Sequence, residues 1–280
     1  MDERNKNIGI FSLDERETTM LYGYHYQALM EVPFDSEKRT VRVWLPSDYD
    51  FDDDKKLFPV IYFSDGQNLV NRYLTAFGDW NLDKVAQSLL DEKKLSFIAV
   101  GVDSPREDKK RCDELNPPYV PDRSKKMHPI GDKFVGFVAD TLKPIIDELF
   151  HTKKEKQYTA IGGSSMGGIM AFYGALYRKD VFGFSLDFSP AFFLYRKKTW
   201  GKLLDQFALS PKDNIKYYLY VGGKGFERQF RSLTRFTYNY LLEKGFDNNS
   251  VAFVYDKAEK HHEDAWNKHL GDAVCFWLNN

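Results

Sequence analysis

The chain has 280 residues, of which 42% are hydrophobic and 29% charged, and its 40 basic and 41 acidic residues leave a net charge of −1. This composition excludes a disordered or fibrous protein, and the balanced charge gives no reason to expect a nucleic-acid or membrane partner. The sequence has no apolar run near the ~18 residues of a membrane helix and no signal-peptide pattern. We therefore expect a cytoplasmic protein with two free thiols, Cys112 and Cys275.

The first 20 residues are treated as an N-terminal extension. Alternating apolar and polar residues then predict two strands, 25–32 and 39–46, joined by a hairpin turn. From residue 58 onward, short β-rich runs alternate with longer helical patterns. Further strands are predicted at residues 58–66, 96–103, 157–165, 182–189, 215–223 and 251–258, and helices at 82–94, 132–150, 168–179, 236–245 and 264–280. Pro144 is expected to bend the second of these helices.

Nearly continuous apolar strands separated by helices are typical of a parallel sheet with helices on both faces. The leading hairpin adds an antiparallel edge to this sheet. We therefore predict a single α/β domain over residues 1–280, with a mostly parallel sheet of about eight strands. Residues 104–131 are charged and rich in proline, and we expect them to form an irregular excursion over the strand ends near the active-site face.

One short motif between a predicted strand and a predicted helix points to chemistry. Gly163-Ser164-Ser165-Met166-Gly167 matches the G-x-S-x-G pattern, in which a sharp turn exposes the hydroxyl of the central serine. Larger side chains at the two glycines would collide with neighbouring backbone. The next N–H group, at the start of a helix, points to where an oxyanion would form. We therefore predict Ser165 as a nucleophile and Met166 as an oxyanion donor, whereas Ser164 lacks this spacing.

A serine nucleophile needs a base, and two adjacent histidines follow the last predicted strand. His261 and His262 occupy the place where the chain order serine, acid, histidine puts the base of an α/β-hydrolase. The four remaining histidines are expected to be structural or solvated, and these are His25, His128, His151 and His269.

Two carboxylates are candidates for the acid of the predicted set. Glu227 lies in the loop after the strand at 215–223, whereas Asp187 lies inside an apolar strand, where a carboxylate needs a partner. We favour Glu227 over Asp187. A serine–histidine dyad without an acid is the third alternative.

The segments "IGGSSMGG", "VIYFSDGQN" and "HHEDAW" together resemble the "putative esterase" branch of the α/β-hydrolases, which includes enterochelin and feruloyl esterases, esterase D and the antigen 85 mycolyltransferases. The resemblance extends from about residue 22 to the C-terminus, and "GDWNLDKV" and "RCDELNPP" also look like family segments around the pocket. It implies an α/β-hydrolase fold. The family pattern H-x-E-x-x-W makes His261 the base. The resemblance also places the second oxyanion donor at Gln67, with Asn68 as the alternative. Gly225 occupies the usual position of the acid, and Glu227 lies two residues further on.

The resemblance implies a serine carboxylesterase acting on a small ester, such as a feruloyl or acetyl sugar or a siderophore ester. Acyl transfer of the antigen 85 type and a non-catalytic binding scaffold are the alternatives. Trp80, Tyr119 and Phe192, near predicted strand ends, are candidate pocket residues beside Asn68, although we favour core or lid packing for most of the aromatic residues there. Neither H-E-x-x-H nor C-x-x-C occurs, so no metal or other cofactor is expected. The oligomeric state is not predicted.

Overall fold

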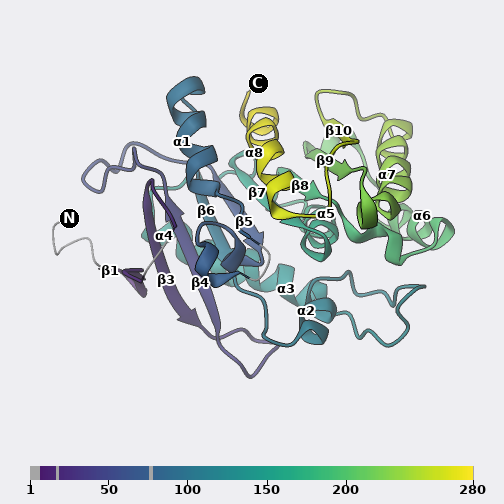
Figure 1. The fold of residues 1–280 in the computed structure, drawn as a ribbon, viewed down its shortest axis with the longest axis horizontal. Coiled ribbons are helices and arrows are strands. Elements are labelled where there is room, and N and C mark those ends of the chain that lie inside the picture. The colour runs from purple at the N-terminus through teal and green to yellow at the C-terminus, as the bar shows by residue number, and fades with distance from the viewer. Residues whose placement is uncertain (1–6, 17–18, 76–77, 280) are drawn as a thin grey trace.

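The computed structural model describes residues 7–16, 19–75 and 78–279. Ten strands form one sheet in the order β1-β2-β3-β4-β6-β5-β7-β8-β9-β10 (Figure 1). The strands are β1 (Asn7–Ile8), β2 (Phe11–Leu13), β3 (Tyr24–Met30), β4 (Arg39–Leu45), β5 (Val60–Ser64), β6 (Ile98–Val102), β7 (Thr159–Ser164), β8 (Phe184–Phe188), β9 (Lys216–Gly222) and β10 (Val251–Asp256).

The sheet is antiparallel from β1 to β4, and β4 also pairs antiparallel with β6. The six strands from β5 to β10 are parallel to one another. The predicted fold class is therefore confirmed, but the expected number of strands is wrong by two. Strands β1 and β2 come from the N-terminal extension, and runs of two and three residues are too short to show a detectable alternation.

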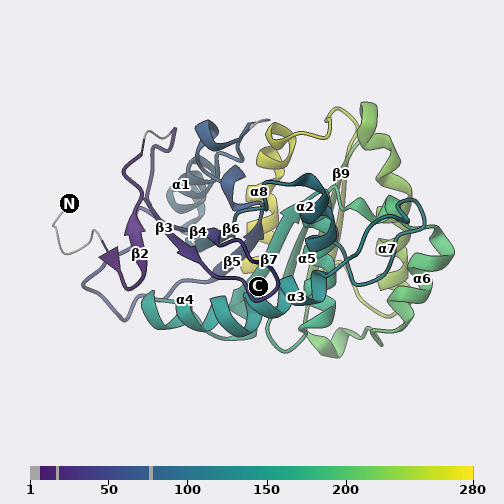
Figure 2. The same cartoon turned by 90° about the horizontal axis from the view of Figure 1, so that it is seen from below.

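Helices cover both faces of the sheet (Figure 2). One hydrophobic core lies between the sheet and α1 (Leu82–Lys93) with α8 (Glu263–Leu278). The larger core lies on the other face, beneath five further helices of the described residues. These are α3 (Gly131–Phe137), α4 (Lys143–Leu149), α5 (Met166–Tyr177), α6 (Lys197–Asp205) and α7 (Arg231–Glu243), and the short α2 (Asp108–Glu114) lies in the excursion. No helix of the described residues is long and apolar enough to cross a membrane.

The helix predicted over residues 132–150 has a local irregularity next to its proline. Between α3 and α4, the segment Val138–Leu142 forms a π-helical turn, and Pro144 follows it directly in the first turn of α4. Proline has no N–H for the carbonyl four residues earlier, and its ring crowds that carbonyl. The wider turn accommodates this loss, so the expected distortion takes the form of a π-helical turn.

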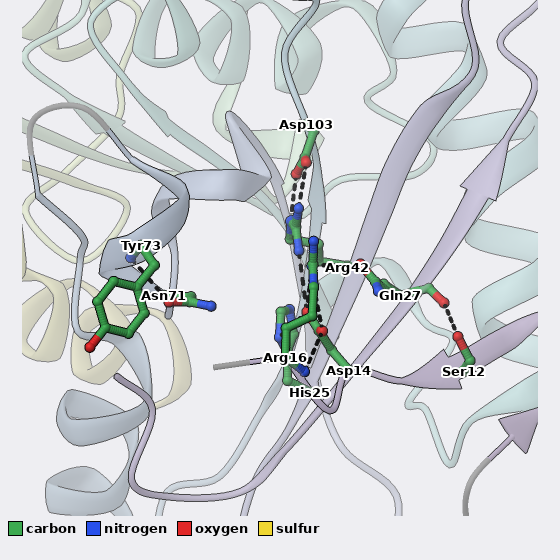
Figure 3. A network of polar contacts seen from close by, with 9 residues as sticks. All are labelled: Ser12, Asp14, Arg16, His25, Gln27, Arg42, Asn71, Tyr73 and Asp103. Atoms are coloured by element: carbon green, nitrogen blue, oxygen red, sulfur yellow. Dashed lines mark hydrogen bonds and ion pairs between the residues drawn. The ribbon is translucent and has the colours of Figure 1, made fainter. Parts of the chain in front are cut away.

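A network of charged side chains ties the N-terminal strands to the carboxyl end of β6 (Figure 3). Arg42 on β4 donates two hydrogen bonds of 2.7 Å to Asp103, which directly follows β6. Asp14 lies 3.6 Å from Nη1 of Arg42 and 3.4 Å from Nδ1 of His25 on β3. Burial and the Arg42 charge lower the pKa of His25 to about 4, so its ring is neutral at neutral pH. His25 therefore has a structural role in the sheet.

Candidate active site

Ser165 lies at a strained turn between β7 and α5. Its φ of 58° and ψ of −114° are unfavourable for a residue with a side chain. Its N–H donates to the carbonyl of Phe188 at 2.9 Å, and its carbonyl accepts from the N–H of Ala191 at 3.0 Å. These two hydrogen bonds to the chain after β8 hold the turn in place. The geometry is that of the sharp strand-to-helix turn on which an exposed nucleophile is carried.

The two glycines of the motif leave room for this turn. A Cβ atom on Gly163 would lie 2.6 Å from the carbonyl carbon of Gly167. A Cβ atom on Gly167 would lie 2.3 Å from Oγ of Ser64 at the end of β5. Both contacts are far shorter than van der Waals distance, so the close approach of β5, β7 and α5 depends on the absence of side chains here.

His261 and Glu227 are joined by a hydrogen bond. Nδ1 of His261 lies 2.5 Å from Oε2 of Glu227, whose side chain is completely buried. The other oxygen, Oε1, accepts from the backbone N–H of Gly222 at 2.8 Å and from the hydroxyl of Ser189. The indole N–H of Trp266 in turn donates to Oγ of Ser189 at 2.9 Å. Both oxygens of the Glu227 carboxylate thus have hydrogen-bond partners, and Oε2 faces the imidazole of His261.

Aromatic rings fix the plane of the His261 side chain. Phe230 stacks against it at a centroid distance of 4.5 Å, and Phe226 and Trp266 make edge-to-face contacts with it at centroid distances of 5.4 and 5.0 Å. With Nδ1 directed at a carboxylate, the proton of a neutral imidazole belongs on Nδ1, and Nε2 is left as the acceptor. That protonation state is the one a general base requires.

Asp187 makes no such contact in the described residues. It lies fully buried in β8 and accepts a hydrogen bond of 2.5 Å from the hydroxyl of Ser185. Burial raises the pKa of Asp187 well above its ordinary value and so favours the uncharged form of this carboxyl group. Of the two acids considered, the structure joins Glu227 to His261.

A cavity of about 500 Å³ brings the candidate residues together at the carboxyl ends of the strands, where open α/β sheets bind their ligands. Ser165 reaches it from β7, His261 from the chain after β10, and Gln67 from the chain after β5. The full lining is Gln67, Asn68, Leu74, Thr75, Asp108, Arg111, Ser164, Ser165, His261, His262, Glu263 and Trp266.

Two backbone N–H groups lie at the starts of helical turns at this end of the sheet, and of their two residues Gln67 lines the cavity whereas Met166 does not. Met166 is the first residue of α5, and Gln67 is the second residue of a 3-10 turn, Gly66–Asn68, so neither N–H has an acceptor within its own helix. The N–H of Asn68 donates instead to the carbonyl of Asp65 at 2.9 Å. The geometry therefore favours Gln67 over Asn68 as the second donor.

Three of the four candidate pocket residues do not line the cavity. Trp80 is buried in the core among other aromatic rings, and Phe192 stacks on Trp200 at 4.5 Å. The hydroxyl of Tyr119 donates to the side chain of Gln206 at 2.7 Å. Trp80 and Phe192 are thus core residues and Tyr119 is a half-buried residue outside the cavity, which corrects the prediction of these three as pocket residues. Asn68 does line the cavity.

Several cavity residues were missed, and Arg111 is the most instructive. It lies on α2, in the segment expected to be irregular, and opens the family-like segment "RCDELNPP". Its Nε and Nη2 atoms donate to the two oxygens of Asp65 at 2.7 and 2.8 Å. Burial alone would raise the pKa of Asp65, but Arg111, with further hydrogen bonds, holds it below its ordinary value. Asp65 is therefore a buried, ionised carboxylate.

A strained serine after a central parallel strand, with an acid and a histidine after later strands, is the arrangement of the α/β-hydrolase fold. The family described as "Putative esterase" matches residues 36–276, and the chain belongs to that family. The resemblance found in the sequence is thereby confirmed.

Individual relatives are distant. The uncharacterized protein YbbA of Bacillus subtilis (strain 168) is 21% identical over 250 residues, covering 86% of this chain and 92% of its own. The siderophore hydrolase EstB of Aspergillus nidulans has a TM-score of 0.72 at 18% identity, covering 94% and 97% of the two chains. A mutant feruloyl esterase module of Clostridium thermocellum, complexed with sinapinate, has a TM-score of 0.64 at 14% identity, covering 92% and 89%. These structural likenesses show the fold.

Proposed function

We propose that the chain is a serine carboxylesterase that hydrolyses a small carboxylic ester through an acyl-enzyme intermediate. The observation that carries this proposal is the hydrogen-bonded pair His261–Glu227, which shares one cavity with a serine at a strained turn. Membership of the esterase family supports the same chemistry.

In the acylation step, Oγ of Ser165 attacks the ester carbonyl carbon while Nε2 of His261 takes the hydroxyl proton. The N–H groups of Met166 and Gln67 stabilise the oxyanion of the tetrahedral intermediate. Its collapse breaks the bond to the alcohol oxygen, and the imidazolium of His261 returns the proton to that oxygen. Glu227 fixes the tautomer of the base and stabilises its cationic form.

In the deacylation step, His261 takes a proton from water, and the resulting hydroxide attacks the acyl carbon. The second tetrahedral intermediate then breaks its bond to Oγ of Ser165, the imidazolium of His261 returns its proton to Oγ, and the carboxylic acid leaves. If another alcohol replaced water, the same intermediate would give acyl transfer. Product ratios measured with added methanol separate the two reactions, and we expect the free acid to dominate.

The cavity of about 500 Å³ lies within the size range of small-molecule sites. Relatives described as a siderophore hydrolase and a feruloyl esterase support siderophore esters and acyl sugars such as feruloyl esters as substrate classes. The polar and charged cavity lining fits substrates rich in hydroxyl groups.

Hydrolysis of p-nitrophenyl acetate and methyl ferulate tests the proposal. Replacing Ser165 with Ala should lower kcat by about 10³-fold or more, since the nucleophile is lost. Ser164→Ala is the matched control, because Ser164 lines the same cavity without the strained backbone, and this variant should keep most of the activity. A wild-type chain that is inert toward both esters and toward a fluorophosphonate probe would refute the esterase assignment.

A further inference from the structure

The carboxylate of Asp65 lies between the two segments proposed to bind the oxyanion. Asp65 directly precedes the 3-10 turn that carries the N–H of Gln67. On the other side, a Cβ atom on Gly167, in the first turn of α5, would lie 3.4 Å from Oδ2 of Asp65. A buried negative charge therefore stands next to the position where the reaction develops a second negative charge.

Without a compensating positive charge, this carboxylate would oppose catalysis. Like charges at short range repel strongly where water is excluded, and oxyanion stabilisation depends on positive charge and N–H dipoles. Arg111 supplies the compensating charge through its paired hydrogen bonds of 2.7 and 2.8 Å to both oxygens. The planar guanidinium matches both carboxylate oxygens at once, which a lysine cannot do.

The same contacts hold a turn that is strained on its own. Asp65 has a φ of 56°, in the left-handed region. A Cβ atom on Gly66 would lie 2.6 Å from the carbonyl carbon of Gly101 on β6, so the turn is pressed against that strand. Ser104 also holds the turn, because the Ser104 hydroxyl donates to Asp65 and the Ser104 N–H donates to Oε1 of Gln67 at 3.1 Å.

We infer that Arg111 is a positioning residue for the proposed reaction. Through Asp65 it holds the turn that presents the N–H of Gln67, and it neutralises the carboxylate beside the oxyanion site. This inference rests on the proposed function. It differs from a role in binding the substrate, in which Arg111 would attract an anionic group of the ester directly.

The two roles separate on a neutral substrate, p-nitrophenyl acetate, with kcat and KM measured for four variants. Arg111→Met removes both the charge and the hydrogen bonds, whereas Arg111→Lys keeps the charge but not the paired geometry. Arg111→Met combined with Asp65→Asn removes both charges. Arg178→Met is the matched control, because Arg178 forms a similar paired contact with Asp180, at 2.9 and 2.8 Å, at the far end of α5.

We expect Arg111→Met to lower kcat by about 10-fold to 100-fold with KM nearly unchanged, since an oxyanion donor acts in the transition state. Arg111→Lys should lose less. The double variant should recover several-fold of the activity lost in Arg111→Met, because the unpaired carboxylate is gone. Arg178→Met should match the wild type. A purely structural role for Arg111 would lower the temperature of thermal unfolding of Arg111→Met but leave kcat per fluorophosphonate-titrated site unchanged.

Three outcomes would overturn the inference. They are an unchanged kcat in Arg111→Met, a rise in KM alone, and a double variant no better than Arg111→Met. If Arg111→Met does not fold, as judged by its thermal unfolding, the kcat of Arg111→Lys decides, and a value equal to wild type counts against the inference. The wild type is first labelled with a fluorophosphonate. Failure of that labelling refutes the proposed function itself, whereas successful labelling with an unaffected Arg111→Met refutes only the inference.

Discussion

Oε2 of Glu227 lies 2.5 Å from Nδ1 of His261, although Glu227 stands two residues beyond the position at which the family pattern places the acid. A 3-10 turn, Gly225–Gln229, begins at that usual position. It places the Glu227 carboxylate within hydrogen-bond distance of the N–H of Gly222 at the end of β9. The departure from the pattern is thus accommodated by local backbone structure.

Glu227→Gln should lower kcat by about 10³-fold to 10⁴-fold, because an amide cannot stabilise the imidazolium and can favour the wrong tautomer of His261. Steady-state hydrolysis of p-nitrophenyl acetate measures the loss. Asp187→Asn is the control, since burial raises the pKa of Asp187 and its carboxyl group bonds Ser185 and not His261. A large loss in Asp187→Asn with little change in Glu227→Gln would reverse the assignment of the acid.

Ser189→Ala should lower kcat by about 10-fold, because it removes one of the hydrogen bonds that orient the Glu227 carboxylate. It should also destabilise the fold by about 1–3 kcal/mol, since the indole N–H of Trp266 loses its acceptor. Ser185→Ala removes an equally buried serine hydroxyl from the same stretch of chain, one that bonds Asp187 instead. Equal losses of kcat in both variants would argue against a specific link from Ser189 to the acid.

Gly163→Ala should destabilise the protein by about 3 kcal/mol or more, because the new methyl group would meet backbone atoms of Gly167 at 2.6 Å. Gly136→Ala is the control within α3, where a Cβ atom meets nothing within 4 Å, and it should stabilise the helix by about 0.5–1 kcal/mol. Urea unfolding measures both changes. The steric account of the motif fails if Gly163→Ala is as stable as the wild type.

Acid should destabilise the native state through His25. Burial and Arg42 lower the pKa of His25 to about 4, against about 6.5 in an unfolded chain. Between these values the unfolded state binds more protons, so stability falls as the pH falls from about 6.5 to about 4 and then levels off. The full effect is on the order of 3 kcal/mol. The free energy of unfolding of wild type and His25→Gln, measured across this range, should differ in slope, whereas parallel curves would exclude the histidine as the cause.

Six of the eight longer strands could be predicted because buried parallel strands are continuous apolar runs that end at turn residues, and the antiparallel β3 and β4 because their apolar and polar residues alternate. Strands β1 and β2 could not, since their few residues pair with a neighbouring strand and leave no periodic pattern of their own. The helix α6 was likewise missed, because Lys197–Asp205 begins with charged residues that look like a loop.

At the site, the residues of short motifs were predictable because the strand-to-turn-to-helix context constrains their geometry. The carboxyl ends of the parallel strands carry Ser165 and Met166 after β7 and His261 after β10. The pocket residues were not predictable, because an aromatic side chain near a strand end can turn toward the core, as Trp80 does. Arg111 was missed because its partner lies 46 residues earlier in the chain.

The most direct test of the central claim is to identify the residue that a fluorophosphonate modifies. The wild-type chain is labelled, digested and sequenced by tandem mass spectrometry. The account predicts a single modification on Ser165, at one equivalent per chain, and none in Ser165→Ala. Modification of Ser164 or of another residue, or undiminished labelling of Ser165→Ala, would contradict it.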